Sequence, residues 1–170
     1  MTFSSIVWLA QGFGIGRVPF APGTFGSILG LAWFAVSLSV RPIWVWTFAN
    51  LLAISAAVWL SGAAEKALGR PDPGSIVIDE IVAVPICFVA WLLESVPSSG
   101  VTPPVATFFS GRALLWTIGV FAAFRLFDVA KPWPVGLSQR LPQGWGIVAD
   151  DLLAAVWVNL IFLLARSWLK

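Results

Sequence analysis

Five apolar segments, separated by shorter polar or proline-containing stretches, make up most of the sequence. Several are shorter than the ~20 residues that a complete helical span prefers, but helix tilt and local bilayer thinning can compensate. None alternates apolar and polar residues as a barrel strand does, and a helix satisfies its own backbone groups in lipid. The pattern therefore predicts an all-α integral membrane helical bundle of four or five apolar helices, in a single domain over residues 1–170. The segments are residues 27–40, 43–60, 81–93, 113–127 and 152–164.

The composition agrees with a membrane protein. Apolar residues make up 59% of the 170 residues and charged residues 11%, against about 45–50% and about 25% in ordinary soluble domains. A soluble domain of this size buries only about 70% of the surface that its unfolded chain exposes, so much apolar surface would remain in water. The alternative interpretation, an unusually apolar soluble helical domain, therefore fits less well. The 11 Trp residues suit a chain with many positions at the lipid headgroup level.

Three polar connections, residues 12–26, 65–80 and 128–151, alternate with connections that carry almost no charge. If five segments cross the membrane in turn, all three polar connections lie on one face. Only one of the 8 acidic residues, Glu94, then lies on the opposite face. The polar face also carries more of the basic residues, so the positive-inside rule predicts that it faces the cytoplasm. Its charged residues are Glu65, Asp72, Asp79, Glu80, Asp128, Asp150, Asp151, Arg17, Lys66, Arg70, Arg125, Lys131 and Arg140, against Arg41, Arg112, Arg166 and Lys170 opposite.

Missing side-chain types exclude several kinds of chemistry. A net charge of +2 without a run of Lys or Arg predicts no nucleic-acid partner. The chain has no His, and its single cysteine, Cys87, can form neither an internal disulfide nor a cysteine zinc site. No Arg follows Cys87 at the fifth position, and neither an Asp-x-Asp pair nor a Gly-x4-Gly-Lys-Ser/Thr loop occurs. Catalysis would therefore depend on carboxylates, hydroxyls, Lys, Arg and a metal ion.

A turn with the sequence Pro-Phe-Ala-Pro-Gly-Thr-Phe-Gly-Ser directly precedes the first long apolar segment. Here Gly23 and Gly26 would let the backbone approach a ligand, and Thr24 and Ser27 offer hydroxyl groups. With Pro22 at its entry, the start of a helix could bind an anion through free backbone N–H groups. The alternative is that Thr24 or Ser27 only caps the helix.

Two pairs of adjacent acids, Asp79-Glu80 and Asp150-Asp151, each stand at the edge of an apolar segment. Carboxylates in such a position are costly unless they are paired or bound to metal. Hard cations prefer oxygen ligands, and Mg²⁺ commonly takes one or two carboxylates in proteins. The alternative is that the acids open helices, where the macrodipole favours negative charge.

Arg125, Asp128 and Lys131 recur every three residues, which places them near one face of a helix end. Pro132 and Pro134 would then stop the helix. Arg and Lys side chains match the charge of a phosphomonoester, so this segment could hold phosphate. The alternative is a helix terminus with local ion pairs.

In order and spacing, these stretches resemble the phosphatidylglycerophosphatase A family over about two thirds of the chain. The matching pieces are Pro-x-Ala-Pro-Gly-Thr-x-Gly-Ser, Asp-x6-Asp-Glu-x-Val, Phe-Arg-x-x-Asp-x-x-Lys-Pro-Trp-Pro and Gly-Ile-x-x-Asp-Asp. The resemblance implies Mg²⁺-dependent hydrolysis of phosphatidylglycerophosphate to phosphatidylglycerol and phosphate in a bacterial inner membrane. Small departures occur at Ala83 and Ala155, where the family usually or often has Gly, and at Trp145, and they bear on packing more than on charge.

These observations lead to one hypothesis for the site. The metal ligands would be Asp79, Glu80, Asp150 and Asp151, with Asp128 as a further ligand or general base. The catalytic set would comprise Asp79, Asp128, Asp150, Arg125 and Lys131, and the substrate would be bound by Pro22, Gly23, Thr24, Ser27, Arg125 and Lys131. The number of metal ions, the choice between water and an aspartate as nucleophile, and the oligomeric state stay open. The alternative function is a small membrane ion transporter or channel with a carboxylate-lined site, which predicts acids spread through the depth of the bundle.

Overall fold

The computed structural model describes residues 3–40 and 42–168, and helices joined by turns and irregular connections make up this part of the chain. Within these residues, Pro42 and Val101 form an isolated antiparallel β-bridge. The all-α prediction is therefore confirmed for the described residues. The helices, in chain order, are α1 (Phe3–Ala10), the 3₁₀ turn η1 (Ile15–Arg17), α2 (Pro22–Ser37), α3 (Ile43–Leu68), α4 (Ile78–Cys87), α5 (Val89–Ser95), α6 (Ala106–Phe109), α7 (Gly111–Ala130), α8 (Val135–Ser138) and α9 (Gly144–Trp168).

Three of these helices, α3, α7 and α9, are long and apolar enough to cross a membrane, and α2 is a shorter apolar helix. This agrees with the lower end of the predicted four or five apolar helices. The apolar segment 81–93 does not form one continuous helix, because the chain breaks at Phe88 between α4 and α5. Pro85, within the last turn of α4, lacks the backbone N–H that a continuous helix would use there.

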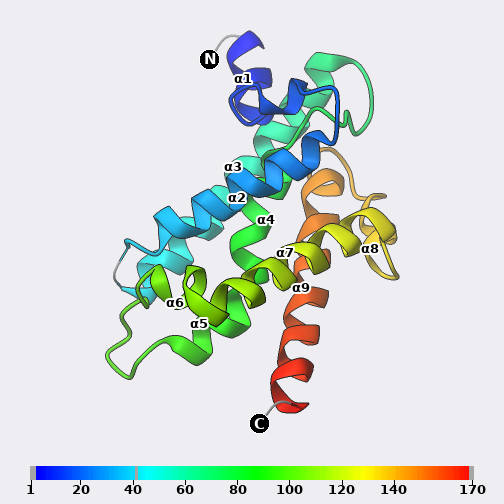
Figure 1. The fold of residues 1–170 in the computed structure, drawn as a ribbon. Helices are drawn as coiled ribbons and strands as arrows, with labels where there is room; N and C mark the ends of the chain where they lie inside the picture. Colours follow the sequence, from blue (N-terminus) through cyan, green and yellow to red (C-terminus); the bar gives the residue numbers. More distant parts are fainter. Residues whose placement is uncertain (1–2, 41, 169–170) are drawn as a thin grey trace.

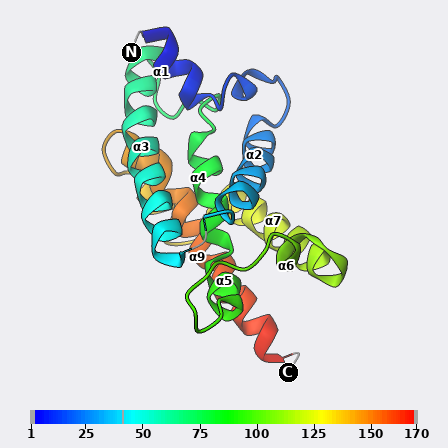
Figure 2. The ribbon, with the colours of Figure 1, turned by 90° about the vertical axis from the view of Figure 1, so that its left-hand side faces the viewer.

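The short helix α4 lies at the centre of the molecule, between α2 and α3 and against α9 (Figures 1 and 2). Most of its side chains are buried. The outer faces of the long helices are instead apolar and exposed, with Trp44, Phe48 and Trp59 on α3 as examples. A lipid environment favours this arrangement, in which apolar side chains face outward and the central helix carries the polar ones.

Small residues allow the helices to approach closely around α4. A Cβ atom added to Gly30 of α2 would lie 2.7 Å from Val84 Cβ of α4, and one added to Gly26 would lie 2.8 Å from Val77 Cβ. Where α3 meets α9, a Cβ atom on Gly144 would clash with the Val58 carbonyl oxygen. Helix association in membranes depends on such close backbone contact, so these glycines determine where α2 and α9 sit relative to the centre.

The polar connections lie toward one end of the molecule, where α2, α4 and α9 begin and α3 and α7 end (Figure 1). At the other end Glu94 pairs with Arg166 at 3.3 Å, beyond an aromatic core in which Phe34 stacks on Phe88 at 4.3 Å between ring centroids. The prediction that the polar motifs gather on one face, with Glu94 opposite, is confirmed. Arg41 and Lys170, which the sequence placed on the Glu94 face, lie outside the described residues.

Candidate active site

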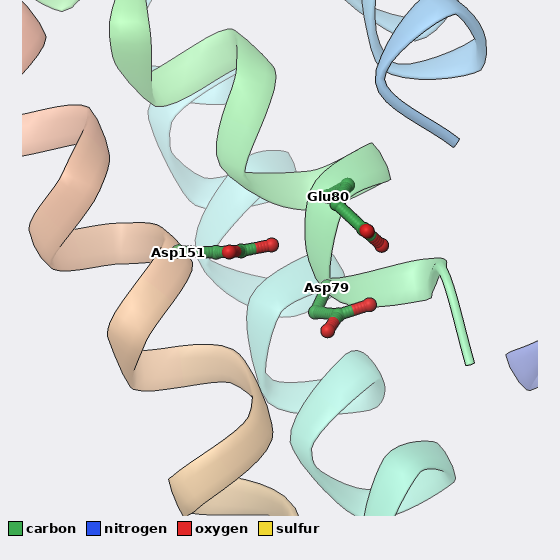
Figure 3. Close-up of side chains that lie close together, drawn as sticks. All are labelled: Asp79, Glu80 and Asp151. Carbon is green, nitrogen blue, oxygen red and sulfur yellow. The ribbon is translucent and has the colours of Figure 1, made fainter. Parts of the chain in front are cut away.

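Three carboxylates from two helices converge at the polar end of the bundle. Asp79 and Glu80 lie in the first turn of α4, and Asp151 lies in the second turn of α9. One oxygen from each carboxylate lies within 4.8 Å of the others, and the three side chains point toward a common space (Figure 3). All three residues are buried, with exposed fractions of 8%, 9% and 3% respectively.

Each of the three acids carries a buried oxygen that lacks a hydrogen-bond partner among the described residues: Asp79 Oδ1, Glu80 Oε2 and Asp151 Oδ2. A buried, unpaired carboxylate oxygen is strongly unfavourable, and three together repel one another. A divalent cation would offset both costs, and a set made only of carboxylate oxygens suits a hard cation such as Mg²⁺. The residues present therefore fit a metal ion.

The pKa values of the two acids on α4 reflect this environment. Burial raises the pKa of Glu80 to about 7, and the nearby charge of Asp128 adds to the effect. Burial, followed by the charge of Glu80, raises the pKa of Asp79 well above its usual range. Both shifts have the same physical cause, namely negative charge withdrawn from water beside other negative charge.

Arg125 joins three helices next to this cluster. Its Nη1 donates hydrogen bonds to Asp128 Oδ2 on its own helix and, at 3.3 Å, to Ser27 Oγ on α2. The same atom lies 3.8 Å from Glu80 Oε1 on α4. The predicted proximity of Arg125 and Asp128 is thus present, and the guanidinium group also reaches an acid of the three-carboxylate cluster.

Lys131 and Asp150 form a second ion pair at the edge of the cluster. Lys131 ends α7 in a left-handed conformation with φ of 44°, and its Nζ donates to Asp150 Oδ2. Partial burial lowers the pKa of Lys131, but its hydrogen bond to Asp150 and the Asp150 charge outweigh this and raise the pKa above its usual value. Asp150, expected beside Asp151 as a metal ligand, is therefore occupied by Lys131 and lies outside the three-carboxylate set.

The Gly-rich segment before Asp150 is itself helical. Helix α9 begins at Gly144, so Asp150 and Asp151 do not open the helix as the sequence indicated. The interpretation of this pair as acids that open or cap a helix is therefore wrong. Asp79 and Glu80 do lie in the first turn of α4, but they are buried there rather than exposed.

The start of α2 packs directly on the cluster. The helix begins at Pro22, its N-cap is Ala21 and no side chain caps it, so the interpretation of Thr24 or Ser27 as a cap is wrong. Ser27 Oγ donates to the Gly23 carbonyl oxygen at 2.8 Å. The N–H group of Thr24 already donates to the Ala21 carbonyl oxygen at 2.9 Å, so it is not one of the free N–H groups that an anion could use, while the Thr24 side chain is partly exposed.

Glycine in this helix start serves the site differently from the sequence prediction. A Cβ atom on Gly23 would lie 2.3 Å from Glu80 Oε1 and 3.1 Å from Arg125 Nη2. Val77 occupies the space that a side chain on Gly26 would need. The close approach that these glycines allow is therefore to the start of α4 and to the side chains of Glu80 and Arg125.

Gln11 and Ser75, two polar residues that the sequence did not single out, fix the position of the segment before α4. The side-chain amide of Gln11 donates to Ser75 Oγ at 3.2 Å, and Arg17 Nε donates to Gln11 Oε1 at 2.7 Å. The Val77 N–H group also donates to the Ala10 carbonyl oxygen at 3.0 Å. The contact between Gln11 and Ser75 joins positions 64 residues apart, so no local pattern could have indicated it.

Comparison with known proteins decides between the possible functions. A model of the phosphatidylglycerophosphatase A family matches residues 8–166. The chain belongs to the phosphatidylglycerophosphatase A family. It is therefore a helical membrane protein and a phosphatase of phospholipid metabolism, and family membership favours the phosphatase over the ion transporter or channel.

Individual relatives cover nearly the whole chain. Phosphatidylglycerophosphatase A of Haemophilus influenzae is 32% identical over 162 residues, 95% of this chain and 88% of the relative. Phosphatidylglycerophosphatase A of Escherichia coli K12 is 29% identical over 163 residues, 94% and 83% respectively. A Bacteroides thetaiotaomicron protein named "Putative phosphatidylinositol-3-phosphatase" is 32% identical over 164 residues, 94% and 92%. No solved structure matches this chain.

Proposed function

We propose that this chain hydrolyses phosphatidylglycerophosphate to phosphatidylglycerol and phosphate, with Mg²⁺ held by Asp79, Glu80 and Asp151. The observation that carries the proposal is the convergence of three buried carboxylates, each with an oxygen that lacks a partner among the described residues. Three ionised carboxylates buried side by side are strongly unfavourable, and a bound cation would balance their charge. Two relatives that carry the name phosphatidylglycerophosphatase A support the choice of substrate.

The residues around the cluster provide the positive charge that a phosphomonoester requires. Arg125 pairs with Asp128 and Lys131 with Asp150, so both side chains are oriented before substrate arrives. Charges fixed in advance stabilise a developing transition state without reorganisation. We assign the phosphate to Arg125 and Lys131, with the Thr24 hydroxyl and the turn at Pro22, Gly23 and Ser27 forming the adjacent wall.

Proton transfer and cation chemistry complete the assignment. When bound, a divalent cation would supply charge neutralisation at the phosphate and lower the pKa of water. Asp128 lies beside Arg125, which also approaches Glu80 of the cluster, and we assign it as the general base that accepts the proton of the nucleophile. Asp79 belongs to the cation site, and Asp150 keeps Lys131 charged and in place.

The membrane arrangement follows from the same polar end of the bundle. We place the chain in a bacterial inner membrane as a multi-pass protein whose polar end faces the cytoplasm, because basic residues are more numerous there. The lipid tails of the substrate can stay in the bilayer beside the apolar outer faces of α3, α7 and α9. The enzyme therefore need not extract its substrate.

The decisive experiment measures phosphate release by purified protein in detergent micelles. Phosphatidylglycerophosphate and phosphatidylinositol 3-phosphate are compared as substrates, each with Mg²⁺ and with EDTA. We expect Mg²⁺-dependent release with phosphatidylglycerophosphate as the preferred substrate. Preference for the inositol lipid would overturn the substrate assignment, and equal release in EDTA would overturn the cation site.

A matched pair of variants connects the activity to the cluster. Asp151→Asn removes one charge from the three-carboxylate set, whereas Glu94→Gln removes one at the opposite end, where Glu94 pairs with Arg166. We expect Asp151→Asn to lose activity and Glu94→Gln to keep it. Full activity of folded Asp151→Asn would show that the cluster is not the catalytic site.

A further inference from the structure

The break between α4 and α5 leaves a gap in the backbone hydrogen bonding of an apolar region. Helix α4 ends at Cys87 and α5 begins at Val89. The Phe88 N–H group bonds to the Pro85 carbonyl oxygen at 3.2 Å, which tightens the chain at this point. Unpaired backbone groups are costly in lipid, so a break of this kind needs partners from a neighbouring helix.

Asn159 of α9 supplies those partners. Its Oδ1 accepts the Ala90 N–H group at 2.7 Å, and its Nδ2 donates to the Ile86 carbonyl oxygen at 2.8 Å. In a continuous α-helix, the N–H group of residue 90 would donate directly to the carbonyl oxygen of residue 86. The Asn159 carboxamide is thus inserted into one helical hydrogen bond, an arrangement that bends helices.

The same carboxamide is anchored to its own helix. Asn159 Nδ2 also donates to the Ala155 carbonyl oxygen at 2.7 Å, so both its donor and its acceptor atoms are used. An amide within an apolar span is unfavourable unless it is bonded in this way. Because the amide is bound on both sides, it couples α9 to the two halves of the broken helix.

The contact of Asn159 with the α4–α5 break lies at a fixed distance along the helices from the three-carboxylate cluster. Asn159 follows Asp151 by eight residues along α9, roughly 12 Å, and Ile86 follows Asp79 by seven along α4, roughly 10 Å. The two helices therefore run side by side from the cluster to Asn159. A shift of one helix along the other at this contact would also move Asp79 and Glu80 relative to Asp151.

We propose that Asn159 is a positioning residue that sets the register of α4 against α9 and thereby the affinity of the three-carboxylate cluster for a divalent cation. The inference rests on the proposed cation site. It assigns a role to a residue that lies about two helical turns from that site and does not belong to the cluster.

Binding of Mn²⁺, followed by electron paramagnetic resonance on the full-length protein in detergent, tests the proposal without requiring turnover. Asn159→Leu keeps the branched shape and the number of heavy atoms of the side chain but leaves Ala90 N–H and Ile86 C=O without their partner. We expect its Mn²⁺ affinity to fall by about tenfold, as for other residues that orient metal ligands. Asn50→Leu is the matched control, because Asn50 is a buried amide in the α3 span that donates to Trp46 of its own helix, and we expect it to bind Mn²⁺ as the wild type does.

A double variant separates positioning from simple support of the fold. In Pro85→Ala/Asn159→Leu, residue 85 regains a backbone N–H group that can donate to the Ile81 carbonyl oxygen, so α4 gains a hydrogen bond that proline denies it and we expect part of the thermal stability lost in Asn159→Leu to be restored. The Mn²⁺ affinity should stay low, because the connection to α9 is still missing. If Asn159→Leu does not fold, the double variant alone provides the test.

Four outcomes would overturn the inference. Unchanged Mn²⁺ affinity in folded Asn159→Leu would do so, as would recovery of affinity together with stability in the double variant. A double variant that does not fold would show that Asn159 is needed for folding itself. Wild-type protein that binds no Mn²⁺ would overturn the proposed cation site as well, whereas the other three outcomes leave that site intact.

Discussion

Lys131 Nζ donates a hydrogen bond to Asp150 Oδ2, which joins the end of α7 to the second turn of α9. The next residue, Asp151, points instead toward Asp79 and Glu80 on α4 (Figure 3). Successive residues of an α-helix point about 100° apart, so adjacent acids can serve different partners. Two acids that look equivalent in the sequence are therefore expected to respond differently to the same substitution.

Asp150→Asn and Asp151→Asn test this difference. Asp151→Asn should weaken Mn²⁺ binding, because it removes a ligand charge. Asp150→Asn should keep Mn²⁺ binding but lower phosphate release by about 100-fold, because Lys131 loses the charge that orients it. Electron paramagnetic resonance and a phosphate assay on the same preparations measure both effects. Loss of Mn²⁺ binding in Asp150→Asn to the same degree would return Asp150 to the metal ligands.

Arg125→Lys tests the need for a guanidinium group. Lysine keeps the charge, but a single ammonium group cannot reproduce the contacts of Arg125 with Asp128, Ser27 and Glu80. We expect turnover to fall by about 100-fold through misplacement of the phosphate-binding group. Arg112→Lys is the control, since Arg112 is exposed at the start of α7. Equal kinetics for Arg125→Lys and wild-type protein would contradict the assignment.

Gly23→Ala tests the close approach of α2 to the site. The added Cβ atom would lie 2.3 Å from Glu80 Oε1, so the Glu80 carboxylate must move and both cation binding and activity should decrease. Gly119→Ala in α7 is the matched control, because a Cβ atom there meets no atom within 4 Å. Alanine is favoured over glycine in helices by up to about 1 kcal/mol, so this control should be active and slightly more stable in thermal unfolding. A fully active Gly23→Ala enzyme would show that Glu80 tolerates displacement.

Membrane orientation can be read from cysteine labelling. Arg70 lies at the polar end and Ser99 in the connection after α5, and both are exposed, while the native Cys87 is buried. In spheroplasts, a membrane-impermeant maleimide should label Ser99→Cys directly and Arg70→Cys only after lysis. The reverse pattern would place the polar end outside the cytoplasm.

Much of the candidate site could be predicted because many of its residues lie close together in the sequence. Asp79 with Glu80, and Arg125 with Asp128, are each separated by three residues or fewer, so helix geometry alone brings them near one another. The pairing of Lys131 with Asp150 and of Arg125 with Ser27 spans 19 and 98 residues. Such contacts depend on how α2, α7 and α9 pack, which no local pattern specifies.

Composition and the order of apolar segments by themselves determined the membrane class, the helical architecture and the gathering of charge at one end. These are properties of single segments, because each backbone group or charge that is buried in lipid has its own free-energy cost, whatever its tertiary neighbours. The tertiary structure alone decided that Asp151 rather than Asp150 joins Asp79 and Glu80, and that the segment 81–93 breaks at Phe88 against Asn159. Those outcomes depend on the rotation and register of each helix, and these follow from contacts such as Gly30 with Val84 and Gly144 with Val58, whose partners lie far apart in the chain.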